Sequence, residues 1–353
     1  MSSLKRIFRR SVVLILLVAA LFVGSIVTTH TLSVATPAHA AAVVGSIQDP
    51  NIKYIGRWDQ TSSTTMYKSY WAATYLKTSF TGKTVKIKLA VAVNIYVSID
   101  GKTDVLYVGA KGTFNLTPTP LATGTHTLRV AVRSGNIEFE GLVLDAGAKT
   151  VAPTVASRLI EFTGDSITAG YTDTNTVLSD YAWLVGEQLH VEHTQIAQSG
   201  ICLVAQSGCY SMGTQYFKLG GIHDINTPNW DFSRYQATAV VINLGTNDNG
   251  HGVTKATFQA AYTTFMRNIR AKYPHAAIFA FETLRQVYVP ETQAAVKALN
   301  AAGDSNVYFV NTVGWIGAGD YSADGGHPND QGQMKIAAKL APIIAKVLGI
   351  PAN

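Results

Sequence analysis

Apolar and polar residues alternate with a period of two through most of residues 51–148. The clearest segments are KTVKIKLA, NIYVSIDGK, THTLRVAVRS and IEFEGLVLD, with glycine-containing turns such as IDGK and ATGTH between them. Such alternation turns one face of a segment toward a core and the other toward water, which is typical of half-buried β-strands. Short strands joined by glycine turns, with no convincing helix among them, predict an antiparallel β-sandwich of the jelly-roll type.

Beyond Arg158 the pattern changes to short apolar runs that alternate with longer helical stretches. The strand-like runs are RLIEFTG, HTQIAQSG, TAVVINLG, AAIFAFETL and NVYFVNTV; the helical stretches are SDYAWLVGEQL, TKATFQAAYTTFMRNIRAKY, ETQAAVKALNAAG and QGQMKIAAKLAPIIAKVLG. Thr254 can cap the second helix, in which four apolar residues share one face: Phe258, Tyr262, Phe265 and Ile269. The alternation predicts an α/β domain whose parallel sheet is covered by helices on both faces.

The first forty residues have the pattern of a secretory signal peptide. MSSLKRIFRR carries four positive charges and no acid, SVVLILLVAALFVGSIV is apolar, and TPAHA has the small-x-small pattern that predicts cleavage after Ala40. Because the apolar run is somewhat long, an uncleaved membrane anchor is the alternative. We therefore divide the chain into a signal peptide (1–40), a β-sandwich domain (41–150), a linker (151–157) and an α/β domain (158–353), and we expect a secreted, extracellular protein.

The formal net charge of +6 belongs largely to the leader. The chain has 28 Lys and Arg against 22 Asp and Glu, and removing Lys5, Arg6, Arg9 and Arg10 leaves 24 basic residues, a net charge of +2. We therefore expect no nucleic-acid partner and, after signal cleavage, no membrane partner. The sequence does not indicate an oligomeric state.

The two cysteines, Cys202 and Cys209, lie seven residues apart in GICLVAQSGCY. In an exported protein this spacing predicts a disulfide that closes a short loop. No histidine close to them in the sequence completes a metal site. We expect no metal or organic cofactor in this protein.

Three predicted strands of the α/β domain end in unusual polar turns. TGDSIT contains Ser166, AQSGI contains Gly200 and NLGTNDNG contains Asn247. A fourth polar cluster, SADGGHPND, precedes the last helix and contains Asp324 and His327. Because ligands of parallel sheets bind beyond the carboxyl ends of the strands, we expect all four turns at one edge of the sheet.

These residue types are the ones that acyl transfer requires. A serine hydroxyl is a poor nucleophile until a base takes its proton, so Ser166 needs His327. Asp324, on the same loop, can hold the histidine in one tautomer. The oxyanion of a tetrahedral intermediate needs donors, for which the N–H groups of Ser166 and Gly200 and the amide of Asn247 are candidates. The pattern predicts a serine hydrolase.

Each of these five residues also has an ordinary explanation as a turn former, a cap or a helix-entry residue. The catalytic interpretation is favoured because every required role occurs in one of four turns that are predicted to converge. Two neighbouring carboxylates, Asp165 and Asp248, are expected to brace turns rather than to take part in the chemistry.

The four turns resemble the sequence blocks of the SGNH or GDSL-type hydrolases. The matching blocks are GDSIT at 164–168, the glycine of QSGI at 200, GTND at 245–248 and DGGHP at 324–328. The resemblance implies a flavodoxin-like α/β/α domain with Ser166 as nucleophile, His327 as base and Asp324 as the third member of a triad. It also implies Gly200 and Asn247, with the Ser166 N–H, as oxyanion donors. There is no GxSxG elbow, which argues against an ordinary α/β-hydrolase.

The layout of the mature chain is similar to that of carbohydrate esterase family 2. The similarity rests on NIYVSIDGK, IEFEGLVLD, the linker into RLIEFTGDSITAGY, and WDFSRYQATAVVINLGTND. Members of that family join a small N-terminal jelly roll to an SGNH domain and remove acetyl groups from plant polysaccharides such as xylan and glucomannan. Some members are described as using a Ser-His dyad. Asp324 stands in the DxxH position here, so the resemblance implies a full triad.

We therefore expect an acetyl xylan esterase-like serine esterase that hydrolyses acetyl esters on carbohydrates through an acyl-enzyme on Ser166. Trp230 and Trp315 are candidates for a sugar platform, and the alternative is that both pack in the core. Two other functions stay open. One is a lipolytic or thioesterase-type SGNH hydrolase for longer acyl esters, and the other is a non-catalytic carbohydrate-binding protein.

Overall fold

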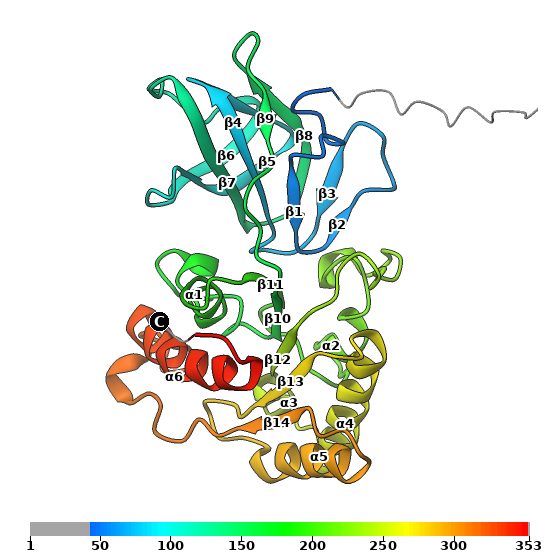
Figure 1. Cartoon of the computed structure of the whole chain (residues 1–353). Helices are drawn as coiled ribbons and strands as arrows, with labels where there is room; N and C mark the ends of the chain where they lie inside the picture. Colours follow the sequence, from blue (N-terminus) through cyan, green and yellow to red (C-terminus); the bar gives the residue numbers. More distant parts are fainter. Residues whose placement is uncertain (1–42, 352–353) are drawn as a thin grey trace, which may run out of the picture. The chain divides into compact units, whose positions relative to one another are not determined.

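The computed structural model describes residues 43–351 of the 353-residue chain (Figure 1). The predicted signal peptide, residues 1–40, lies outside the described residues. Within residues 43–351, no helix combines the length and the apolar character needed to cross a membrane. An antiparallel β domain is followed by a parallel α/β domain, which confirms the fold class predicted from the sequence.

The β domain consists of nine strands that pair antiparallel in one sheet, in the order β1-β4-β7-β5-β8-β3-β2, with β6 beside β5 and β9 beside β4. Their bounds are β1 (Lys53–Ile55), β2 (Trp58–Asp59), β3 (Tyr67–Ser69), β4 (Tyr75–Gly82), β5 (Val85–Ile99), β6 (Val105–Asn115), β7 (Gly124–Ser134), β8 (Ile137–Leu144) and β9 (Thr150–Val151). The alternating apolar residues fill the core as predicted: Ile87, Val130 and Phe139 are buried, on β5, β7 and β8.

Two segments that the sequence pattern separates, KTVKIKLA and NIYVSIDGK, belong to the single strand β5. Residues 85–89 of β5 pair with β8 and residues 94–99 pair with β7, and each pairing contains a register shift, at Lys88/Leu89 and at Asn94/Ile95. The sequence pattern missed β6, because most of its side chains are exposed and do not alternate. Gly109 and Gly112 also interrupt β6 at positive φ, which is typical of bulges at a sheet edge.

The α/β domain has a five-stranded parallel sheet in the order β11-β10-β12-β13-β14. The strands are β10 (Leu159–Gly164), β11 (Glu192–Ala197), β12 (Ala239–Asn243), β13 (Ala277–Phe281) and β14 (Val307–Val310). The helices are α1 (Tyr181–Gln188), α2 (Met212–Gln215), α3 (Thr246–Gly250), α4 (Lys255–Lys272), α5 (Val289–Ala301) and α6 (Asp330–Leu348), with short 3-10 turns η1 (Thr176–Leu178), η2 (Ile222–Asp224) and η3 (Ala318–Asp320). All five strands and the four longer helices coincide with the predicted segments.

Helices cover both faces of this sheet, α1 and α6 on one face and α4 and α5 on the other (Figure 1). Helix α4 begins where Thr254 accepts a hydrogen bond from the N–H of Thr257 at 3.2 Å. Its predicted apolar face is buried against the sheet: Phe258, Tyr262, Phe265 and Ile269. Strand β9 ends at Val151 and β10 begins at Leu159, with no helix or strand between them. The domain boundaries around the linker 151–157 stay a prediction.

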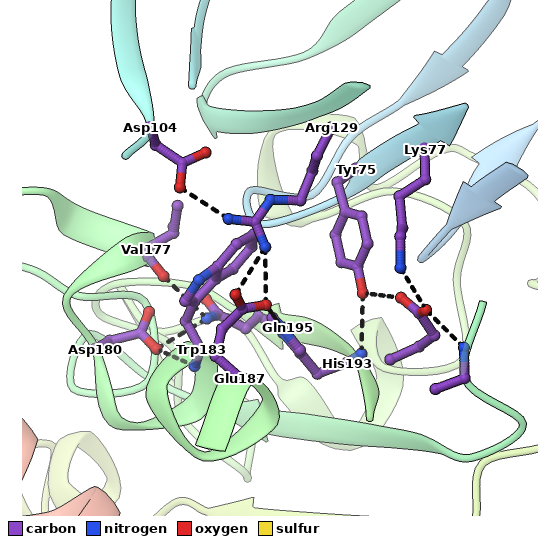
Figure 2. A network of polar contacts seen from close by, with 12 residues as sticks. Tyr75, Lys77, Asp104, Arg129, Val177, Asp180, Trp183, Glu187, His193 and Gln195 are labelled. Atoms are coloured by element: carbon purple, nitrogen blue, oxygen red, sulfur yellow. Dashed lines mark hydrogen bonds and ion pairs between the residues drawn. The ribbon is translucent and has the colours of Figure 1, made fainter. Parts of the chain in front are cut away.

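A polar network joins the β domain to helix α1 and strand β11 (Figure 2). The guanidinium of Arg129, on β7, donates two hydrogen bonds to Glu187 at 2.8 and 2.9 Å and one to Asp104 at 2.8 Å. Glu192, at the start of β11, accepts from Tyr75 and Lys77 of β4 at 2.5 and 2.8 Å. Hydrogen bonds between charged groups are shorter and stronger than those between neutral groups. The β domain is therefore attached to the α/β domain at defined points.

A second junction is fully buried. Arg57, which follows β1, inserts into the α/β domain and donates to Glu161 of β10 at 3.3 Å and to the carbonyl of Lys218 at 2.9 Å. Its guanidinium lies 4.8 Å from the ring centre of Tyr216 and 5.7 Å from that of Trp230. Removing one partner of a buried ion pair leaves an uncompensated charge, which typically costs several kcal/mol. This pair therefore links the two domains through a fully buried contact.

Candidate active site

The sheet register brings the polar turns to one edge. Gly164, the last residue of β10, is paired with Ala197 of β11 on one side and with Asn243 of β12 on the other. All three strands are parallel, so the turns that contain Ser166, Gly200 and Asn247 leave the sheet at the same edge. This arrangement was predicted from the alternation of strands and helices.

The turn after β10 is shaped by Gly164 and Asp165. A Cβ at Gly164 would lie 2.1 Å from Oγ1 of Thr168, so the turn has no room for a side chain there. Asp165 is buried, and its Oδ1 accepts a hydrogen bond from the N–H of Ile167 at 3.0 Å. Burial raises the pKa of Asp165 to about 6. Asp165 braces the turn, as expected, and Ser166 is presented beyond the strand end.

Ser166, His327 and Asp324 form a continuous chain of hydrogen bonds. Nε2 of His327 lies 2.8 Å from Oγ of Ser166, and its Nδ1 lies 2.6 Å from Oδ2 of Asp324. With the Nδ1 proton donated to Asp324, Nε2 is free to accept the proton of the serine. Serine and histidine are 161 residues apart in the sequence, and the fold places them in direct contact. This geometry is the one that the triad prediction requires.

Asp324 is held as a carboxylate by its own loop. Its Oδ1 accepts hydrogen bonds from the N–H of Gly326 at 2.8 Å and from the hydroxyl of Ser322 at 2.7 Å. These donors, together with the contact to His327, keep the pKa of Asp324 below its usual range. The carboxylate therefore stays ionised at any pH at which the histidine can act as a base. The sequence analysis missed Ser322, which no separate motif marks.

The three candidate oxyanion donors lie around the same edge. One N–H of the Asn247 amide donates to the carbonyl of Ile201 at 2.9 Å, which leaves its second N–H available. Gly200 has a φ of +77°, and a Cβ built there would meet nothing within 4 Å, so the residue borders open space. Within residues 43–351, the backbone N–H groups of Ser166 and Gly200 have no hydrogen-bond acceptor. Their role as oxyanion donors stays a prediction.

Asp248 holds the loop that follows Gly200. The carboxylate is fully buried, and its two oxygens accept hydrogen bonds from the N–H groups of Leu203 at 2.8 Å and Val204 at 2.9 Å. Burial raises the pKa of Asp248, although these two donors act against the shift. Asp248 follows Asn247 in the short helix α3. This helix therefore carries one candidate oxyanion donor, Asn247, and anchors the loop that carries another, Gly200.

The two cysteines are joined in a disulfide, as predicted. The fold brings His251 close to them: a ring nitrogen and both sulfurs lie within 4.8 Å of one another. His251 lies far along the chain from Cys209, so sequence spacing could not reveal this approach. Because the sulfurs are bonded to each other, neither is available as a thiolate ligand. The cluster therefore does not fit a metal.

The structure separates the two tryptophan candidates. Trp230 is only 7% exposed and packs against Arg57 and Tyr235, which lie toward the amino ends of β10 and β12. The prediction that Trp230 forms a sugar platform at the active site is therefore wrong, because the triad lies at the opposite edge of the sheet. Trp315 follows β14 and is half-buried against Phe281, 5.5 Å between ring centres.

Comparisons with known proteins find relatives of both domains. Residues 162–335 match the model of the GDSL-like lipase/acylhydrolase family, and residues 54–153 match the carbohydrate esterase 2 N-terminal domain. The chain belongs to the GDSL-like hydrolases with a carbohydrate esterase family 2 architecture. The cellulase/esterase CelE of Acetivibrio thermocellus is 29% identical to this family member over 330 residues, which cover 85% of this chain and 40% of CelE.

Two further relatives extend the comparison of this family 2 chain. An acetylxylan esterase/glucomannan deacetylase of Cellvibrio japonicus is 28% identical over 203 residues, which cover 52% of this chain and 56% of the relative. A solved family two carbohydrate esterase from Clostridium thermocellum, in complex with cellohexaose, is 26% identical. Its TM-score is 0.73, with 84% of this chain and 99% of that chain covered. The chain thus spans about half the length, or less, of these two curated relatives.

Proposed function

We propose that this protein is a secreted carbohydrate acetylesterase that uses a Ser166–His327–Asp324 triad. The observation that carries the proposal is the hydrogen-bonded chain from Ser166 Oγ through the imidazole to the Asp324 carboxylate. The names of the relatives support an acetylated glycan such as xylan or glucomannan as substrate. The leader sequence supports secretion, with the mature chain starting after Ala40.

Acylation begins when Oγ of Ser166 attacks the carbonyl carbon of the acetyl ester and Nε2 of His327 takes its proton. The tetrahedral intermediate carries a negative charge on the former carbonyl oxygen. Donors from Gly200, Asn247 and the Ser166 N–H would stabilise this charge, and each such donor is worth about 3–4 kcal/mol of transition-state stabilisation. The intermediate collapses when His327 returns the proton to the sugar oxygen. The sugar alcohol leaves, and the acetyl group stays on Ser166.

Deacylation repeats the same steps with water in place of the serine hydroxyl. His327 accepts a proton from water, the resulting hydroxide attacks the acetyl-serine, and the second intermediate releases acetate as the proton returns to Ser166 Oγ. Asp324 stays ionised throughout and stabilises the imidazolium that forms in each half-reaction. These steps draw only on side chains and backbone groups of this chain and on water.

The test is acetate release from acetylated xylan, acetylated glucomannan and 4-nitrophenyl acetate, with wild type beside Ser166→Ala. We expect release by wild type and a loss of about 10⁴-fold or more in Ser166→Ala. Ser305→Ala, an exposed serine between α5 and β14, is the matched control and should keep full activity. Retained turnover in Ser166→Ala, or rates that rise from acetate to octanoate esters, would overturn the proposal in favour of another nucleophile or a lipolytic enzyme.

A further inference from the structure

A cavity of about 620 Å³ is lined by residues of both domains. On the hydrolase side it is lined by Tyr171 and Ser199, which are close in the chain to Ser166 and Gly200. On the other side it is lined by residues of the β domain, among them Tyr70 and the β7–β8 turn. Ligand cavities in proteins typically enclose about 300–1,000 Å³, so this one has the size of a ligand site.

Tyr171 connects the cavity to the catalytic centre. Its backbone N–H donates to the carbonyl of Ser166 at 3.0 Å, and its ring lies 4.8 Å from the imidazole of His327. The preceding Gly170 has a φ of +66°, and a Cβ there would lie 2.5 Å from the backbone of Thr176, so the turn needs glycine. The side chain of Tyr171 is nevertheless 53% exposed. An exposed aromatic ring beside the base offers a flat surface to a sugar ring that extends from the active serine.

The β7–β8 turn, residues 133–136, supplies polar groups on the opposite wall. Nε of Arg133 donates to the hydroxyl of Tyr96 at 3.1 Å, which fixes the guanidinium. Within residues 43–351, the two terminal nitrogens of Arg133 have no acceptor, so they remain available to a ligand. Asn136 reaches across to Asp224 of the hydrolase domain at 3.4 Å. The cavity wall thus presents the terminal guanidinium nitrogens of Arg133 beside the amide of Asn136 and the carboxylate of Asp224. Together these groups can donate hydrogen bonds to the hydroxyls of a neutral glycan and accept hydrogen bonds from them.

The turn is also held at a defined distance from the triad. Arg129 lies four residues before Arg133 on β7, and one terminal nitrogen of its guanidinium donates to both carboxylate oxygens of Glu187 on helix α1. The buried pair of Arg57 and Glu161 attaches the same domain to strand β10, which carries Ser166 at its end. A wall of a binding site must be positioned rigidly if it is to add affinity, and these contacts supply that rigidity.

We infer that the β7–β8 turn, residues 133–136, binds the sugar units adjoining the acetylated one, so that the β domain completes the substrate site. This inference rests on the proposed function. It predicts that an acetylated oligosaccharide is a better substrate than an acetylated monosaccharide, because only the oligosaccharide has adjoining sugar units for the turn to bind.

The experiment compares kcat/KM for acetate release from an acetylated monosaccharide and from acetylated xylohexaose. We expect the wild-type value to be at least about tenfold higher for the hexasaccharide, since one hydrogen bond to a charged group is worth about a tenfold change or more. Arg133→Ala should lower that ratio about tenfold, mainly through KM. Arg133→Lys should restore part of it. Lys111→Ala, an exposed cation on β6, is the control and should keep the wild-type ratio.

Binding provides a second readout that does not depend on turnover. Calorimetric titration of acetylated xylohexaose into Ser166→Ala, with and without Arg133→Ala, should show about tenfold weaker binding in the double variant. A hexasaccharide advantage that is absent, or that Arg133→Ala leaves unchanged in both assays, overturns the inference while the esterase assignment stands. No acetate release from any carbohydrate by wild type would instead overturn the proposed function.

Discussion

Asp248 offers a way to perturb the oxyanion region without touching a reacting atom. Its carboxylate accepts two hydrogen bonds from consecutive backbone N–H groups of the loop after Gly200, at 2.8 and 2.9 Å. In Asp248→Asn the side-chain oxygen can accept one of these bonds, but the amide NH2 faces the other N–H. The variant therefore loses one bond to a charged acceptor and sets two donors against each other, while the side-chain volume is nearly unchanged.

The expected magnitude follows from the hydrogen bonds. A bond to a charged group contributes about 1.5–3 kcal/mol, so the loop is destabilised locally by an amount of that order. Loss of one correctly placed oxyanion donor costs about 10²–10³-fold in rate. Because the loop is also held by the disulfide and by the Asn247 contact to Ile201, we expect a smaller effect. The prediction is a fall in kcat of about 10- to 100-fold.

The assay separates an effect on the oxyanion from a general loss of stability. KM for 4-nitrophenyl acetate should change little, and inhibition by a boronic acid that forms a tetrahedral adduct on Ser166 should weaken in parallel with kcat. Asp59→Asn is a matched control, since Asp59 is also a buried carboxylate that accepts two consecutive N–H groups, those of Thr61 and Ser62, in the β domain. A kcat that stays at the wild-type level, or one that falls while boronate affinity is kept, would refute the reasoning.

Three further predictions concern other parts of the molecule. Asp324→Asn should lower kcat by roughly 10³-fold with little change in KM, since His327 loses its orienting carboxylate; a fall of less than tenfold would point to a Ser-His dyad. Arg57→Ala should lower the free energy of unfolding by about 3–5 kcal/mol in urea titrations, because Glu161 stays buried without its cation; an unchanged midpoint would contradict this. Burial and the nearby Asp330 raise the pKa of Asp173 to about 7. The native state then holds a proton that the unfolded state releases between about pH 4 and 7, so stability falls as pH rises through this window, and Asp173→Asn should flatten that slope.

Much of the fold follows from local patterns. The apolar face of α4 and its Thr254 cap are local features, and the structure places both where the sequence indicates. The strands β10 to β14 were predicted because strands buried on both faces read as continuous apolar runs. Strand β6 was missed for the opposite reason: it lies at the sheet edge with most side chains exposed, so its apolar and polar residues do not alternate.

The site residues could be predicted where their residue types suit acyl transfer and where they lie in polar turns of the α/β domain. Ser166 follows strand β10, and Asp324 and His327 lie in the loop before α6, which was expected at the same edge of the sheet. Trp230 has no comparable constraint, and its burial against Arg57 comes from packing between two domains. Tyr171 was not predicted as a site residue either. Its exposed ring lies next to the imidazole of His327, and the order of residues along the chain does not indicate this contact.

The central claim is that Ser166 is the nucleophile of a carbohydrate acetylesterase. The most direct measurement is the release of acetate from acetylated xylan by wild type and Ser166→Ala, combined with mass spectrometry of the acid-quenched wild-type enzyme during turnover. The account predicts acetate release only by wild type and an acetyl group on Ser166 in the quenched enzyme. Equal acetate release by the two proteins, or an acetyl group on another residue, would contradict it.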